Sequence, residues 1–232
     1  MLAFVASPAL AQDIAISFGD DGSLATRSVQ LVVLITVLSL VPGIAIMVTC
    51  FPFIVTVFAI LRQAIGLQQS PPNMLIISLA LFLTYFVMEP VFLEAWENGI
   101  EPLVNGTMEV EEAFVRAMEP LRTFMIERVE PDTYTTLAEL RPDVGGQMPV
   151  TETPLSVLVP SFLLSEIARA FQVGFLIFMP FLIIDLVVAA VLMSMGMMMV
   201  PPAIVSLPFK LAFFVVADGW GLLASSLVRS YS

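Results

Sequence analysis

Long apolar stretches separated by a few charges predict a helical membrane protein. Arg27 and Arg62 enclose 34 residues without a charge. A span needs about 20 apolar residues, so this stretch is one over-long helix or a broken one. Pro42 and Pro52 lie inside it and favour a break. The next apolar segment, Met74–Met88, has 15 residues, which as a helix is short for a bilayer core of about 30 Å.

A single carboxylate stands in the middle of the longest apolar stretch. Arg169 and Lys210 enclose 40 residues, and Asp185 is their one charge. A carboxylate in a run long enough to cross a bilayer is costly, so we expect it to face a partner, a polar cavity or a water path. Short or broken apolar segments with such a charge are typical of channels and transporters.

Methionine is concentrated just after this carboxylate. Five of the seven residues from Met193 to Met199 are methionine, and Pro201-Pro202 follows. Methionine side chains are flexible and polarizable, and suit surfaces that close tightly and then re-pack around something variable. The alternative is that these methionines fill an ordinary core.

Composition narrows the class of protein further. Of the 232 residues 59% are hydrophobic and 12% are charged, with a mean hydropathy of +0.98. Histidine is absent, and the one cysteine, Cys50, lies in an apolar run. These counts give no disulfide framework and no plausible zinc or iron–sulfur site, so we expect no cofactor. The net charge of −11 argues against binding nucleic acid.

The first 11 residues have features of a signal peptide. The segment 1–11 is apolar, has small residues at Ala9 and Ala11, and precedes the polar Gln12. A basic n-region is missing, because the first positive charge is Arg27. We favour a cleaved signal over a plain hydrophobic tail.

Residues 94–153 differ in kind from the rest of the chain. They carry 13 acidic residues against four arginines. Apolar residues at helical spacing between Val110 and Met125 predict a helix, which Pro120 is expected to divide. The stretch Pro131–Pro154 is rich in proline, glycine and threonine, and predicts a loop.

The fold class that follows is all-α: a polytopic, membrane-associated helical protein with short or broken hydrophobic helices and an acidic extracytoplasmic helical region. The bias of basic residues towards the cytoplasm places Arg62 and Lys210 inside, and the acidic region and both termini outside. The expected organisation is a signal peptide (1–11), an extracytoplasmic segment (12–27), N-terminal hydrophobic helices (28–93), the acidic region (94–154) and C-terminal hydrophobic helices (155–232).

A polar stripe opens the last third of the chain. It shares one face of a helix and consists of Ser161, Ser165, Glu166, Arg169 and Gln172. Glu166 and Arg169 either form a local pair three residues apart, or face a lumen or a neighbouring subunit. Buried charges need partners, so we expect Glu166, Lys210 and Asp185 to be paired, and we favour Glu166 with Lys210.

At these motifs the sequence resembles the FliP family, the P subunits of the bacterial flagellar type III protein export gate, whose injectisome homologues are close relatives. The resemblance is dense over about 155–232, and Phe51–Pro72 resembles the family's first helices. The signal-like start and Pro201-Pro202 favour the flagellar branch over the injectisome branch. The motifs that carry it are Pro160-Ser161-Phe162, Ala170–Phe175, Pro180–Asp185, Val191–Met199, Ser206–Lys210 and Asp218-Gly219-Trp220.

The resemblance implies a function that composition does not reach. Family members are not enzymes; several copies assemble with Q and R subunits into a pore in the bacterial inner membrane, at the flagellar basal body. Unfolded flagellar proteins are secreted through that pore. The methionine-rich loop, here Met197, Met198 and Met199, is viewed as a gasket that seals it. Other export-apparatus membrane proteins and lipid are the further partners implied.

Two alternatives of other classes stay open. An intramembrane aspartyl protease could use Asp185 and Asp218, because two carboxylates that share a proton can do acid–base work. They are 33 residues apart, and nothing in the sequence fixes them side by side. A small-solute transporter would show two matching halves, and we find no internal repeat.

Overall fold

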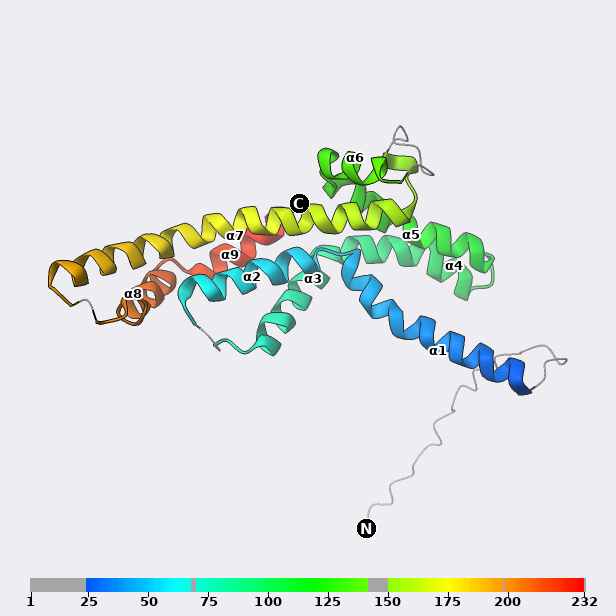
Figure 1. Ribbon diagram of the computed structural model, residues 1–232. Helices are drawn as coiled ribbons and strands as arrows, with labels where there is room; N and C mark the ends of the chain where they lie inside the picture. Colours follow the sequence, from blue (N-terminus) through cyan, green and yellow to red (C-terminus); the bar gives the residue numbers. More distant parts are fainter. Residues whose placement is uncertain (1–23, 68–69, 142–149, 198, 232) are drawn as a thin grey trace, which may run out of the picture. The chain divides into compact units, whose positions relative to one another are not determined.

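The computed structural model describes residues 24–67, 70–141, 150–197 and 199–231, and over these residues every regular element is a helix (Figure 1). The predicted all-α class is therefore confirmed. The chain divides into two units, Met1–Gly43 and Ile44–Ser232. The predicted signal peptide and residues 12–23 lie outside the described residues.

Helix α1 (Leu24–Met47) is apolar on all sides. Two of its hydroxyl groups bond within the helix: Thr36 donates to the Val32 carbonyl (2.7 Å) and Ser39 to the Thr36 carbonyl (2.7 Å). Pro42 lies inside α1 without ending it. Thus the predicted break in the first apolar stretch exists, but it falls at residues 48–50, just before Pro52 in the first turn of the next helix.

Helix α2 (Phe51–Ile65) supplies the centre of the core in the second unit. It packs against α3 and α7, and ends at Gly66, whose φ of 90° suits glycine. Its buried residues follow the helical repeat, as expected of a helix packed on one side. The fully buried ones are Phe53, Ile54, Val57, Phe58, Leu61 and Ala64.

Helix α3 (Asn73–Ala95) continues through a π-helical turn (Trp96–Ile100) into α4 (Glu101–Val104). Together they form a candidate span of 32 residues, so the expectation of a short segment over Met74–Met88 is wrong for the helix. Glutamates become frequent after Met88 and interrupt the apolar run, but glutamate is a good helix former, so the helix continues.

The acidic region is more helical than expected. Helix α5 (Val110–Arg128) passes through the buried Pro120 without dividing, so the tertiary packing outweighs the lost hydrogen bond. Helix α6 (Pro131–Glu139) and a 3₁₀ turn (Val150–Glu152) occupy part of the predicted loop. Pro131 begins α6, where a missing N–H costs nothing.

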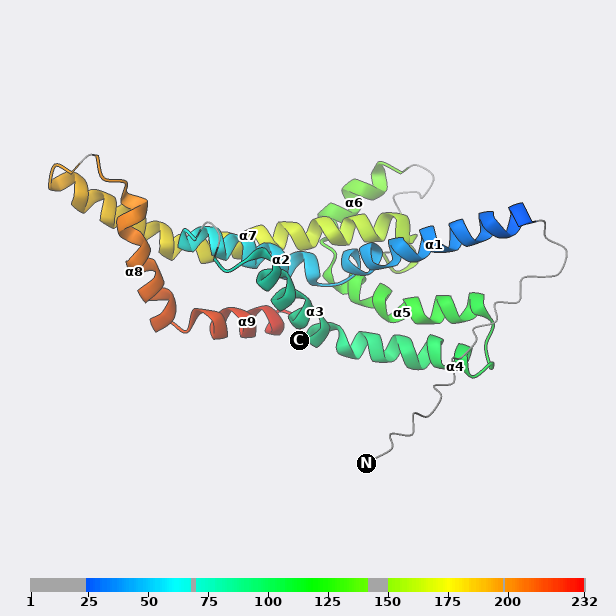
Figure 2. The same cartoon turned by 90° about the horizontal axis from the view of Figure 1, so that it is seen from below.

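Helix α7 (Leu155–Ser194) has 40 residues, about 60 Å of helix. At Gly174 it crosses α2 so closely that a Cβ would lie 2.4 Å from Ile60 Cδ1. Helix α8 (Pro202–Val216) contacts α7 and leaves its end at a steep angle in Figure 2, and α9 (Gly219–Arg229) meets α8 at a 60° corner. Asp218 forms this corner in the left-handed conformation, with a φ of 49°.

Three of the described helical segments are long and apolar enough to cross a membrane. These segments are Arg27–Met47, Asn73–Val104 and Leu155–Ser194. A fourth candidate exists if the bent pair α8–α9 acts as one span.

Candidate functional site

Two ionic sites on α7, one fully buried at Glu166 and one partly buried at Asp185, hold the helices of the second unit together. In the first, the Lys210 Nζ on α8 donates to Asp185 Oδ2 on α7 (2.6 Å) and to the Ala64 carbonyl on α2 (3.1 Å). Ser206 Oγ donates to the other carboxylate oxygen, Asp185 Oδ1 (2.5 Å). This site therefore joins α2, α7 and α8.

The local sequence explains this geometry. Ser206 and Lys210 are four residues apart, so they lie on one face of α8 and both reach the same carboxylate. Ala64 is in the last turn of α2, where carbonyls without helical partners attract a cation. Lys210 is 5% exposed, and a buried ammonium group is stable only with such partners.

The second site is built around Glu166 of α7, which is fully buried. Its Oε1 accepts from Arg128 Nε on α5 (3.0 Å) and from Arg169 NH1, one turn along α7 (3.2 Å). The Tyr231 hydroxyl donates to Oε2. Burial and the neighbouring Glu166 charge raise the pKa of Tyr231, so its hydroxyl keeps the donated proton at neutral pH.

Tyr231 is tied to three helices near the C-terminal end. Arg128 lies 4.0 Å from the centre of the Tyr231 ring and donates to the Ser230 carbonyl (2.8 Å). The same ring stacks on Phe124 of α5 (5.9 Å) and meets Phe53 of α2 edge-on (5.7 Å). This second site thus fixes the end of the chain to α2, α5 and α7.

The favoured pairing of Glu166 with Lys210 is wrong. Glu166 and Asp185 are 19 residues apart on the same continuous helix, a separation of about 28 Å. Since Lys210 contacts Asp185, it cannot reach Glu166. The alternative, a local Glu166–Arg169 pair, is present.

Three members of these sites were missed by sequence reasoning. Ser206 could have been found, because it lies one helical turn before Lys210. Arg128 and Tyr231 could not, because they are 38 and 65 residues from Glu166, and only the packing of α5 and the C-terminal segment on α7 brings them there.

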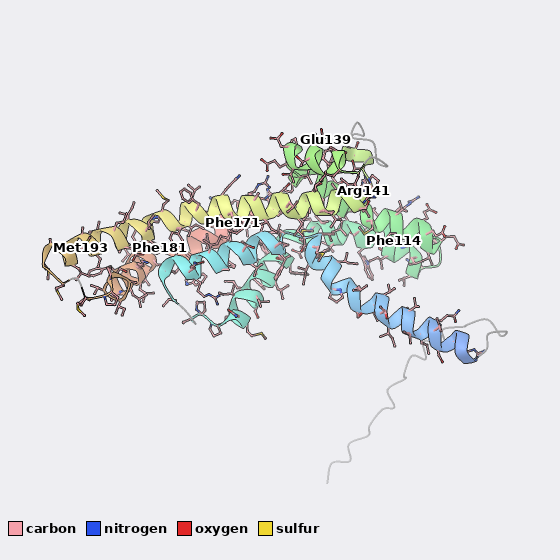
Figure 3. The ribbon with its side chains drawn as sticks, in the orientation of Figure 1. Phe114, Glu139, Arg141, Phe171, Phe181 and Met193 are labelled. Carbon is pink, nitrogen blue, oxygen red and sulfur yellow. The ribbon has the colours of Figure 1, made fainter. Side chains whose placement is uncertain are left out.

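The methionine-rich loop lies at the turn between α7 and α8 (Figure 3). The reversal uses Gly196, whose φ is 75°, a conformation that favours glycine. Met198 lies outside the described residues. The described methionines of the loop and of the turn before it are all exposed, Met199 most of all at 96%: Met193, Met195, Met197 and Met199.

The carboxylates do not form a catalytic pair of the aspartyl-protease type. Neither hydrogen-bond partner of Asp185 is a carboxylate, since both its oxygens accept from Lys210 and Ser206. Asp218 forms the α8–α9 corner instead. Among the described residues no group of three or more His, Cys, Asp and Glu side chains could hold a metal ion.

Comparison with known proteins decides the family. Residues 34–227 match the FliP family. The chain belongs to the FliP family. The FliP match includes Glu166, Asp185, Lys210 and the methionine loop, while Tyr231 lies beyond it.

Relatives that match nearly the whole chain agree with this assignment. A flagellar biosynthetic protein FliP of Caulobacter vibrioides is 53% identical over 230 residues, covering 99% of this chain and 86% of the relative. The protein of the same name in Rhizobium meliloti is 48% identical, covering 91% and 86%. That of Bacillus subtilis is 44% identical, covering 89% and 93%. The resemblance inferred from the sequence motifs is thereby confirmed.

Proposed function

We propose that this chain is a subunit of the flagellar protein export gate in the bacterial inner membrane. Several copies, with Q and R subunits, form a pore through which unfolded flagellar proteins are secreted. The observation that carries this proposal is the FliP-family match, with relatives named flagellar biosynthetic proteins over 86–93% of their lengths. Those names also favour the flagellar branch over the injectisome.

The exposed surface of a single chain supports an assembled state. The half of α7 beyond the α2 crossing and the outer face of α8 expose many large apolar side chains, including Phe175, Leu186 and Val216. Apolar patches of this extent mark contact with lipid or with other subunits. The ion pair of Lys210 with Asp185 joins α7 to α8, the two helices that flank the methionine loop.

The methionine loop fits the role of a deformable seal. Its described side chains are exposed in one chain, whereas Met88 and Met125 fill the core. Exposed methionines from several copies can interdigitate, exclude water and re-pack around a passing chain. The proposed orientation places the acidic region and both termini in the periplasm, and Arg62 and Lys210 towards the cytoplasm.

Complementation of a deletion strain tests this function. Wild-type protein should restore secretion of flagellar proteins into the medium. The triple variant Met197→Ala, Met198→Ala, Met199→Ala should assemble, yet admit small ions or solutes into cells that express the gate. If the wild-type protein is produced in the deletion strain and secretion is not restored, the export role is refuted. Normal assembly without added leak would refute the seal alone.

The proteolytic alternative loses its structural basis. Asp185 is engaged with Lys210, and Asp218 is at the start of α9. We therefore expect that Asp185→Asn abolishes no peptidase activity. Its effect should appear as a lower stability of the helix packing.

A further inference from the structure

An apolar groove of about 580 Å³ lies outside both ionic sites, where the end of α3, the π-helical turn and α4 pack beside α5. We call it the hairpin groove. Phe114 of α5, which is labelled in Figure 3, lines this groove. The walls of the groove are formed mainly by large apolar side chains: Phe92, Trp96, Ile100, Leu103, Phe114 and Met118.

The floor of the hairpin groove is made of small residues. A Cβ added at Gly99 would lie 2.6 Å from both the Ala113 carbonyl oxygen and the Ala117 Cβ, so the two backbones are as close as they can be. Gly99 is in the π-helical turn, a form that is rare and frequently found at functional sites. Small floor residues between large walls produce a groove rather than a flat face.

Lipid cannot be what covers this groove on the α5 side. Helix α5 carries seven charged residues among its 19, so it cannot lie in hydrocarbon. Yet Val110 and Phe114 on this helix are 67% and 63% exposed, and Trp96 across the groove is 49% exposed. Apolar side chains at this density in a water-facing helix indicate a protein contact.

The segments that form the groove are acidic, and this charge defines the partner's chemistry. Residues 94–121 contain seven glutamates, all exposed, and one arginine, Arg116, which already pairs with Glu112 (2.6 Å). A partner with basic residues beside an apolar stripe complements this rim. The same segment of a second copy offers no such face, since residues 94–121 contain one basic residue, Arg116.

We propose that the hairpin groove binds an amphipathic helix of a different protein, whose apolar stripe is flanked by lysine and arginine. An apolar helix face laid into a groove is an established mode of recognition, with anchors at positions i, i+3, i+4 and i+7. The acidic rim fixes the orientation of the helix and speeds its association. This binding does not depend on the export role.

The test uses the full chain in nanodiscs of zwitterionic lipid and three labelled 18-residue peptides. The first has a leucine stripe at helical spacing flanked by lysine and arginine; the second has the same composition scrambled; the third has glutamate for every basic residue. Fluorescence anisotropy should show the first binding at least tenfold more tightly than the other two, with empty nanodiscs as blank. Phe114→Ser should weaken that binding at least tenfold. The matched control is Phe82→Ser, on α3 outside the groove and 66% exposed, which should change nothing.

The rim is tested by removing charge. Glu97→Gln with Glu101→Gln should weaken binding about threefold to tenfold and flatten its salt dependence. Glu127→Gln with Glu139→Gln removes as much charge away from the groove and should have a smaller effect. Equal binding of the scrambled peptide, or binding indifferent to Phe114→Ser, would overturn the proposal. So would concentration-dependent self-association that Phe114→Ser abolishes, because a second copy would then be the occupant.

Discussion

Replacing Arg128 by methionine probes the buried site at Glu166. The change keeps most of the side-chain volume but removes the Nε contact to Oε1 (3.0 Å), the bond to the Ser230 carbonyl and the cation over the Tyr231 ring. Glu166 stays fully buried. Breaking a buried pair by removing one partner costs about 3–5 kcal/mol. Because Arg169 remains 3.2 Å away, we expect a loss of about 3 kcal/mol.

The matched control is Arg116→Met on the same helix. Arg116 pairs with Glu112 at 2.6 Å, but both side chains are more than half exposed, so the expected loss is below about 0.5 kcal/mol. For a chain of this size 1 kcal/mol shifts Tm by roughly 2–4 °C. Arg128→Met should therefore lower the apparent Tm of the purified protein by about 6–12 °C, and Arg116→Met by about 2 °C at most.

A second variant separates lost charge balance from lost packing. Adding Glu166→Gln to Arg128→Met removes the unpaired buried charge and should recover part of the fall in Tm. Equal shifts for Arg128→Met and Arg116→Met, or a double variant no better than Arg128→Met alone, would show that Glu166 is not the buried charge described here.

Three further changes probe the packing, each read by Tm or by labelling. Lys210→Met should cost about 2–3 kcal/mol, and adding Asp185→Asn should restore part of it; no recovery would contradict their pairing. Gly174→Ala should cost about 1–3 kcal/mol, because its Cβ would lie 2.4 Å from Ile60 Cδ1, and Ile60→Ala should relieve it; a silent Gly174→Ala would contradict the close crossing. Burial raises the pKa of the Cys50 thiol to about 12, so almost none of this thiol is ionised at pH 8. Maleimide labelling should be slow until the protein is unfolded, and equal rates before and after would refute this.

The helical class could be predicted from the sequence, because apolar runs without charges have few folds open to them. The helix limits could not. Pro120 lies inside α5 and Pro131 begins α6, because packing and position decide what a proline does to a helix. The helix that contains Met74–Met88 extends to Val104. The hydropathy pattern marks the end of the apolar run, but the backbone hydrogen bonds of the helix continue past that point.

The candidate sites were predicted in part. A lone charge such as Asp185 in an apolar run predicts that some partner exists, because an unpaired charge there is too costly. It does not name the partner. The sequence favours Glu166 as the partner of Lys210, and the length of α7 rules that out. Arg128 and Tyr231 reach Glu166 only through tertiary packing, which no local spacing encodes.

The proposed role in the export gate can be settled by what this chain assembles with. The measurement is a native mass spectrum of the complex purified from inner membranes through a tag on this chain. We expect a hetero-oligomer that contains several copies of the chain together with the Q and R subunits. A spectrum that shows only single chains, or copies of this chain without Q and R subunits, would contradict the proposal.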